Sequence, residues 1–256
     1  MSSLHAVVVV PARYDSQRFR GKVLAPIGGK PLIQWVYQRA ARAQLVDRAW
    51  VATDSEQVRD ACLAFTEDVW LSESEHASGT DRVAELAREV RAEIFVNVQT
   101  DEPMMDPELV DALIRLMEAE NLDFASAVAP IRGMDDFLDP NVVKVVCDAA
   151  GDALYFSRAP IPWPRGSELA PGAPWPQDLR AWKHIGIYGY RREALLRLAE
   201  IPRSQSEITE SLEQLRVLDQ GWKMRILEWD YEGIGVDTEA DLEKLRKYIN
   251  TVDIKD

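Results

Sequence analysis

The side chains best suited to chemistry near the start of the chain are the cations of residues 11–30. This segment, PARYDSQRFRGKVLAPIGGK, carries five basic residues and one acid, giving a net charge of +4 in a chain whose formal net charge is −13. Clustered cations repel one another, so the segment is favoured when an anion binds to it. The pattern therefore predicts a loop that holds the phosphates of a nucleotide. The cations are Arg13, Arg18, Arg20, Lys22 and Lys30.

Two acidic groups follow predicted strands later in the chain. Residues 99–103 include Asp101 and Glu102, and residues 235–238 include Asp237. Two hard carboxylates can hold Mg²⁺, which keeps several waters and takes further ligands from phosphate. Together with the cationic loop, they indicate a magnesium-nucleotide site. Simpler interpretations stay open, because the first pair fits a solvated strand end and Asp237 fits the neighbour of a helix cap.

Other familiar motifs are missing. The residues Gly28-Gly29-Lys30 precede a proline and lack the GxxxxGK[ST] spacing of a P-loop. The sequence has no GxGxxG, which argues against a dinucleotide-dependent dehydrogenase. No Ser-His-Asp spacing stands out. His184, one of three histidines, has apolar neighbours and would also fit a buried core position.

The elements that must position these groups alternate between strand and helix over the first half of the chain. The valine run at residues 7–10 is typical of a strand covered on both faces of a parallel sheet. Asp106-Pro107 supplies an N-cap and a first helical residue. The alternation predicts an α/β fold with a doubly wound, mostly parallel sheet, whose ligands bind at the carboxyl ends of the strands. The other predicted strands are 50–53, 69–71 and 94–99, and the helices begin near 31, 55, 81 and 106.

The regular alternation of predicted strands and helices ends after residue 123. Residues 142–147 and 153–157 flank a polar turn and predict an antiparallel hairpin, and the proline-rich residues 160–176 predict a lid or subunit contact. We expect one domain over residues 1–256, in which roughly residues 130–190 form a smaller embedded antiparallel section. The remaining predictions are strands at 124–129, 185–190 and 223–228 and helices at 192–199, at 208–218 and after Thr238.

Composition narrows the class of protein. The 256 residues are 46% hydrophobic and 29% charged, which is ordinary for a globular protein. No apolar run approaches the ~20 residues of a membrane-spanning helix, and the N-terminus lacks the pattern of a signal peptide. The acidic balance argues against nucleic acid as the main partner. Cys62 and Cys147 lie in apolar segments, and buried thiols in a reducing cytoplasm are the expectation.

The chain resembles the 3-deoxy-manno-octulosonate cytidylyltransferases, or CMP-Kdo synthetases, over nearly its whole length. Any one of the matching stretches is weak, but ten in the correct order make a chance resemblance implausible. They are PARYDSQRFRGK (11–22), GGKPLI (28–33), VATD (51–54), HASGTDR (76–82), QTDEPM (99–104), VKVV (143–146), ALYFSRAPIPWPR (153–165), KHIGIYGYRR (183–192), ESLEQLR (210–216) and GVDT (235–238).

The resemblance implies a Mg²⁺-dependent enzyme that transfers CMP from CTP to a 3-deoxy sugar acid and releases pyrophosphate. It also implies a homodimer formed through the middle section and a role in lipopolysaccharide biosynthesis. Arg13, Ser16, Arg18 and Lys22 are the implied triphosphate-side residues, with Arg13, Arg18, Lys22 and Asp101 the catalytic ones. The implied cytosine and ribose pocket is Ser78, Thr80 and Arg82, and the implied metal ligands are Asp101 and Asp237. The implied acceptor site is Gln99, Arg158, His184, Tyr188, Glu213 and Gln214.

Two positions depart from the family pattern inside its strongest motifs. Arg20 replaces a usual proline, and Thr100 replaces a usual glycine, which would permit close backbone approach. Neutral drift is one interpretation, and a changed acceptor, such as a phosphonic acid, is another. A CTP-binding module without catalysis and a sugar-1-phosphate nucleotidyltransferase also stay open. A sugar-1-phosphate nucleotidyltransferase would leave the predicted acceptor-binding residues unexplained.

Overall fold

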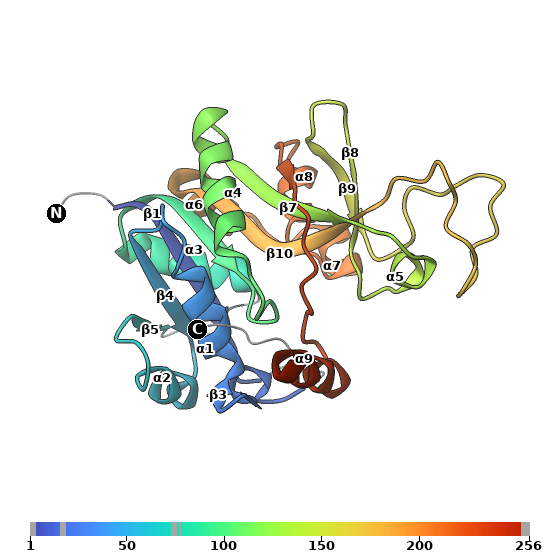
Figure 1. Cartoon of the computed structure of the whole chain (residues 1–256). Helices are drawn as coiled ribbons and strands as arrows, with labels where there is room; N and C mark the ends of the chain where they lie inside the picture. The colour runs from blue at the N-terminus through green and yellow to red at the C-terminus, as the bar shows by residue number, and fades with distance from the viewer. Residues whose placement is uncertain (1–3, 16–18, 73–75, 77, 252–256) are drawn as a thin grey trace.

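A computed structural model describes residues 4–15, 19–72, 76 and 78–251. Arg18 and Ser16, two of the predicted phosphate-side residues, lie outside the described residues. Among those described, nine strands form one mixed sheet, flanked by helices on both faces (Figure 1). The predicted α/β class with a mostly parallel sheet is confirmed.

The central sheet is parallel except for one long strand. β10 (Trp182–Arg191) runs antiparallel to both of its neighbours, β6 and β7, while β1 pairs in parallel with β4 and β6. The order of these strands is β11-β7-β10-β6-β1-β4-β5, and the two remaining strands of the sheet, β8 and β9, lie off this path, with β8 paired to β10 and to β9. The other bounds are β1 (Leu4–Ala12), β4 (Arg48–Thr53), β5 (Val69–Leu71), β6 (Ala92–Val98), β7 (Phe124–Pro130) and β11 (Arg225–Glu228).

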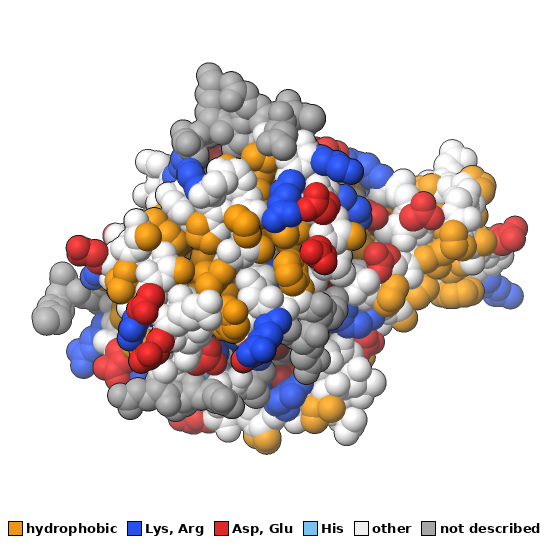
Figure 2. Space-filling view, turned by 90° about the horizontal axis from the view of Figure 1, so that it is seen from below, with side chains coloured by type: hydrophobic (Ala, Val, Ile, Leu, Met, Phe, Trp, Pro, Cys, Tyr) orange, Lys and Arg blue, Asp and Glu red, His pale blue; other side chains and the backbone are white. Residues whose placement is uncertain are grey.

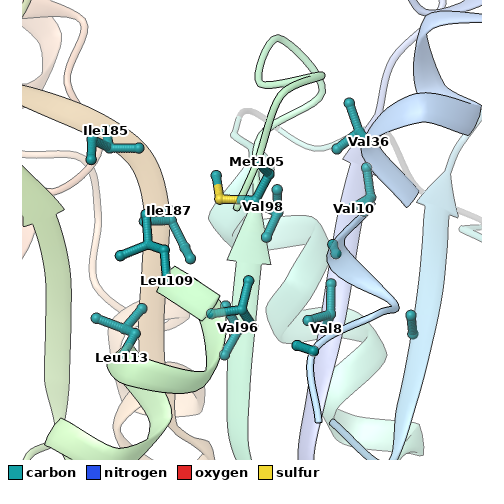
Figure 3. Close-up of a cluster of buried hydrophobic side chains, with 14 of the residues drawn as sticks. Val8, Val10, Val36, Val96, Val98, Met105, Leu109, Leu113, Ile185 and Ile187 are labelled. Atoms are coloured by element: carbon teal, nitrogen blue, oxygen red, sulfur yellow. The ribbon is translucent and has the colours of Figure 1, made fainter. Parts of the chain in front are cut away.

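The alternation of side chains along β1 explains why the sheet is covered twice. Val8 and Val10 belong to one hydrophobic cluster, and Val7 and Val9 to another on the opposite face, all with no exposed surface. Figure 3 shows the first cluster, in which residues of β1, β6 and β10 meet α1 and α4. The helices on this face are α1 (Leu32–Ala40), α2 (Glu56–Cys62) and α4 (Pro107–Ala119); on the other they are α3 (Gly79–Glu89) and α6 (Arg192–Ala199).

Between β7 and β10 the chain leaves the sheet and returns. Residues 131–181 contain α5 (Met134–Leu138) and the hairpin of β8 (Lys144–Cys147) and β9 (Ala153–Ser157), as the sequence predicts for the hairpin. They also carry a small hydrophobic cluster in which Phe137 meets Trp175 edge to face. This segment projects from the body of the molecule (Figure 1).

The single helix predicted at 208–218 is wrong. The structure has two short helices instead, α7 (Gln205–Glu210) and α8 (Leu215–Asp219). Ser211 between them adopts a left-handed conformation with φ of 54°, which ends α7. The break places Glu213 and Gln214 outside regular helix, facing α3 and β10.

After β11 the chain runs as an extended segment, residues 229–238, past the loop after β6 to the loop after β1; this segment is here called the strap (Figure 1). Thr238 and Asp241 exchange backbone and side-chain hydrogen bonds at the start of α9 (Glu239–Thr251), the predicted capping arrangement. α9 packs on the short strand β2 (Pro26–Ile27), which pairs with β3 (Lys30–Pro31) and follows the 3-10 turn η1 (Lys22–Leu24). The strap therefore returns the end of the chain to the cationic loop.

Candidate active site

A pocket of about 770 Å³ opens where β6 and β10 meet the strap and the embedded segment. Its wall combines all eight residues predicted for the metal and the acceptor. They are Gln99, Asp101, Arg158, His184, Tyr188, Glu213, Gln214 and Asp237. The predicted nucleotide residues Lys22, Ser78, Thr80 and Arg82 do not line this pocket, and nor does Arg13.

The floor of the pocket is formed where β10 departs from regular pairing. The register of β10 against β7 shifts between Ile185 and Tyr188, and Gly186 lies in that irregularity. A Cβ atom at Gly186 would come within 3.2 Å of side-chain carbons of Gln99 and Glu102. Glycine therefore allows the loop after β6 to approach β10 closely, and the backbone N–H of Gln99 donates to the Gly186 carbonyl at 3.0 Å.

Lys22 brings together the two aspartates predicted as metal ligands. Its Nζ lies 3.9 Å from Asp101 Oδ2 and 3.5 Å from Asp237 Oδ1, and it donates to the Val236 carbonyl at 2.6 Å. The lysine side chain is only 9% exposed. One ammonium therefore lies within ion-pair distance of both carboxylates in this structure. The sequence did not predict this, because Lys22 is expected at the triphosphate.

Glu102 ties the strap to the loop that carries Asp101. Its carboxylate accepts hydrogen bonds from the hydroxyl of Tyr231 at 2.9 Å and from the N–H of Gly186 at 3.2 Å. Burial, followed by the nearby charge of Asp101, raises the pKa of Glu102 to about 7. The backbone N–H of Val236 also donates to the Asp101 carbonyl at 2.9 Å. These contacts set the separation between the two aspartates.

The two carboxylates fit a magnesium ion by their chemistry. Within the described residues no group of three or more His, Cys, Asp or Glu gathers as a metal site. Asp101 and Asp237 supply hard oxygens that already lie around one cation, the Lys22 ammonium. Mg²⁺ commonly uses one or two protein carboxylates and fills its octahedron with water and phosphate oxygens. The donor set therefore matches a nucleotide-bound magnesium better than a structural metal.

The predicted cytidine pocket is built from side chains that bond within the protein. Ser78 caps α3 by accepting from the N–H of Asp81. The hydroxyl of Thr80 donates to Glu213 at 2.6 Å. Arg82 is fully buried and pairs with Asp54, and burial lowers its pKa, with Arg13 nearby acting in the same direction. These residues stay predicted nucleotide contacts, and the structure places them along the start of α3.

The part of the pocket predicted to bind the acceptor contains a neutral histidine. Ser126 donates its hydroxyl hydrogen to the Ile187 carbonyl, so the 2.7 Å contact between Ser126 Oγ and His184 Nε2 requires the histidine to donate. Burial lowers the pKa of His184 to about 3. The neutral ring with its hydrogen on Nε2 leaves Nδ1 as an acceptor. His184 is thereby suited to a substrate hydroxyl.

The segment between α7 and α8 provides one donor that lacks a partner. Gln214 is 3% exposed and accepts from the hydroxyl of Tyr188 at 3.3 Å. Its Nε2 has no hydrogen bond to the part of the chain that the structure describes. A buried amide without a partner is costly, so it favours a bound oxygen atom. Glu213 differs, because its carboxylate already accepts from the N–H groups of Gly79 and Thr80.

The two residues that depart from the family pattern, Arg20 and Thr100, differ in their exposure to solvent. The side chain of Arg20 is 75% exposed, and its Nε donates to Asp15 at 2.8 Å. Its charge is thus paired at the surface. Thr100 lies half-buried in the turn after β6, between Gln99 and Asp101. Nothing in the structure explains the threonine.

Comparison with known proteins decides the family. The cytidylyltransferase family model matches residues 7–226. The 3-deoxy-manno-octulosonate cytidylyltransferase of Geobacter metallireducens is 46% identical over 240 residues, 93% of this chain and 94% of the relative. The enzyme of the same name from Pelobacter propionicus is 44% identical and covers 98% of this chain and 100% of the relative. This chain belongs to the 3-deoxy-manno-octulosonate cytidylyltransferase family. The family expected from the ten sequence stretches is confirmed.

A solved structure agrees with this assignment to the cytidylyltransferases. A CMP:2-keto-3-deoxy-manno-octonic acid synthetase complexed with CTP superposes with a TM-score of 0.88 at 42% identity, covering 96% of this chain and 99% of that one. A cytidylyltransferase from Leptospira borgpetersenii, only 15% identical, shares the fold with a TM-score of 0.62. The chain is therefore a nucleotidyltransferase.

Sequence reasoning missed two residues that this cytidylyltransferase uses to build its pocket. Tyr231 binds Glu102 from the strap. Lys144 is fully buried in β8, within the matched stretch VKVV. A lysine among four valines in a predicted hairpin strand is the signal that could have drawn attention to it.

Proposed function

We propose that the chain transfers CMP from CTP to 3-deoxy-manno-octulosonate (Kdo) or a closely related 3-deoxy sugar acid, with release of pyrophosphate. The observation that carries this proposal is the pocket, whose wall holds both aspartates together with Arg158 and His184. An acidic sugar needs a cation for its carboxylate and neutral polar groups for its hydroxyls, and these side chains supply both. The names of the relatives support the same acceptor.

We assign Mg²⁺ to Asp101 and Asp237, where it would polarise the phosphate oxygens and neutralise the charge that develops on them. Lys22 contacts both aspartates and belongs to the cationic segment at residues 11–30. Lys22, with Arg13 and Arg18, would bind the triphosphate and stabilise the departing pyrophosphate. Such groups act mainly by positioning and by electrostatic stabilisation.

The acceptor hydroxyl releases its proton to water as its oxygen forms the new bond to the α-phosphorus, and the bond from that phosphorus to the bridging oxygen of pyrophosphate breaks. Arg158 is assigned to the carboxylate of the sugar acid. His184 Nδ1 and Gln214 Nε2 are assigned to sugar hydroxyls, as acceptor and donor respectively. Gln99 and Tyr188 complete the acceptor wall. Each assignment follows from the hydrogen-bonding capacity that the residue retains in the structure.

The test follows pyrophosphate release from CTP and Mg²⁺ with Kdo and, separately, with a panel of phosphonic acids. Turnover with Kdo alone is the expected result. Turnover with a phosphonic acid alone, or CTP binding without pyrophosphate release, would contradict the proposal. Asp101→Asn should abolish magnesium-dependent turnover. Asp68→Asn is the matched control, because Asp68 pairs with Arg48 outside the pocket.

We further propose that the chain is a single domain that forms a homodimer in the cytoplasm, through the embedded section at roughly residues 130–190. Leu154, Tyr155 and Trp163 of this section are 61%, 39% and 67% exposed. Figure 2 shows hydrophobic side chains gathered on the projecting part of the molecule. Among the described residues, no helix has the length and hydrophobicity needed to cross a bilayer. Light scattering should give twice the chain mass, and Trp163→Glu should shift it toward the monomer.

A further inference from the structure

The most unusual buried charge outside the residues assigned so far is Lys144. Its side chain has no exposed surface, and no carboxylate bonds to it among the described residues. Its Nζ donates instead to three backbone carbonyls, those of Asp139 at 2.8 Å, Val142 at 2.5 Å and Arg158 at 2.7 Å. An ammonium has three hydrogens, so all of its donors are used. Burying a cation costs free energy, so a fully buried lysine is expected to have a structural or functional role.

The three carbonyls all belong to the wall of the pocket or to its support. Asp139, Val142 and Arg158 line the pocket, and Lys144 lies behind them in β8. β8 pairs with β9 so that Lys144 lies opposite Ser157, the residue before Arg158. The ammonium therefore joins the turn before β8 to the end of β9.

Both the backbone carbonyl and the guanidinium of Arg158 bond to this junction. Lys144 holds its carbonyl, and Arg158 Nη1 donates to the Pro140 carbonyl at 2.9 Å, in the turn that Lys144 also holds. On the other side, Arg158 Nε donates to the Glu210 carbonyl at 2.7 Å. Nη2 has no hydrogen bond to the described residues. This nitrogen of the guanidinium therefore stays able to donate to a bound molecule.

We propose that Lys144 is a positioning residue for the acceptor, because its ammonium fixes the backbone that aims the Arg158 guanidinium into the pocket. This inference rests on the proposed function, in which Arg158 binds the carboxylate of the sugar acid. Lys144 itself touches no substrate in this arrangement. Its effect is confined to the acceptor half of the site, since its three partners lie in the embedded segment.

The same geometry makes the acceptor site sensitive to pH. Burial lowers the pKa of Lys144 to about 8, against which Asp139 and Glu210 act by attraction, while Arg158 adds repulsion. Lys183 lies opposite Lys144 on β10 and its ammonium reaches toward Asp136, at 3.9 Å. Above pH 8 the neutral amine has two hydrogens for three carbonyls, so one carbonyl loses its donor. Acceptor binding therefore weakens as the pH rises through about 8.

The experiment compares wild type, Lys144→Met and Lys223→Met. Lys223 is the matched control, because its exposed ammonium bonds Asp152 away from the pocket. Lys144→Met should raise the KM for Kdo by about 10- to 100-fold, the range for a misaligned hydrogen bond to a charged group, while the KM for CTP changes less than about 3-fold. It should also abolish the loss of acceptor kcat/KM above pH 8. An equal rise in both KM values, or an unchanged pH profile, would overturn the proposal.

Two further measurements keep the test decisive. In an Arg158→Ala background, Lys144→Met should add nothing to the KM for Kdo; a full additional effect contradicts action through Arg158. Hydrogen exchange at residues 157–159 should rise in Lys144→Met even if no sugar acid is turned over, so failure of this inference can be told from failure of the proposed function. If Lys144→Met does not fold, the wild-type acceptor profile across pH 8 decides.

Discussion

Lys22→Met removes a cation that serves two partners at once. In the protein without nucleotide, the ammonium lies 3.5 and 3.9 Å from the two aspartate oxygens and bonds the Val236 carbonyl. Each charge pair is worth about 4 kcal/mol before solvent screening at an effective dielectric of ~20. The aspartates are 37% and 30% exposed, so about 1 kcal/mol for each pair is realistic. The hydrogen bond to the carbonyl adds about 1.5 kcal/mol.

The net loss of stability in Lys22→Met should therefore be about 3.5 kcal/mol, or a fall in Tm of roughly 7–14 °C for a chain of this size. Magnesium binding should change in the opposite direction. Without the competing ammonium, the two carboxylates should bind Mg²⁺ about 10-fold more tightly in the absence of CTP, since the repulsion removed exceeds ~1.4 kcal/mol. Turnover should nevertheless fall by ~100-fold, because a charge stabiliser is lost from the transition state.

Calorimetry with and without Mg²⁺, together with pyrophosphate release, measures all three effects. Lys223→Met is the control, because its exposed ammonium bonds Asp152 away from the two aspartates. The combination of weaker folding, tighter magnesium binding and slower turnover is specific to a lysine that shares the aspartates. If Lys22→Met binds Mg²⁺ more weakly than wild type, the reasoning is refuted, because Lys22 then supports the metal site rather than competing for it.

Two other predictions concern the wall of the pocket. Glu213→Gln should raise the KM values for both CTP and the acceptor by roughly 5- to 30-fold. Glu213 joins the start of α3 to the segment between α7 and α8, and a lost hydrogen bond to a charged group costs about 1–2 kcal/mol. An effect on the KM of one substrate alone would contradict this coupling. His184, with its pKa lowered to about 3, binds a proton only in the unfolded chain between pH 3 and about 6.5. Stability should therefore fall by up to ~1.4 kcal/mol per pH unit as the pH drops below 6.5, and His184→Gln should remove that slope in urea unfolding at several pH values.

Much of the fold follows from local sequence patterns. The valine run of β1 predicts a strand buried on both faces, and the structure buries alternate valines in separate clusters. Asp106-Pro107 predicts the start of α4, where Asp106 caps the helix. In each case the pattern and the partners are close in sequence or repeat along one element. Local chemistry is then sufficient.

The helix predicted at 208–218 shows where local reasoning stops. Helical spacing favours one helix there. However, Glu213 bonds the start of α3 at Thr80, which lies 133 residues earlier in the chain. That tertiary bond and the left-handed Ser211 replace the helix with two short ones. Lys22 is similar, because its contact with Val236 spans 214 residues. No spacing within one segment predicts such a partner.

The strap makes the order of synthesis relevant to activity. Lys22 is made 215 residues before Asp237, so at ~5–20 residues per second roughly 10–40 s separate the two on the ribosome. During that interval the cationic loop and most of the sheet exist without the second carboxylate. A chain interrupted before the strap has Lys22 and Asp101 but lacks Asp237, the second acid beside the ammonium. The contacts of the Lys22 ammonium with both aspartates are therefore completed only after the strap has been made.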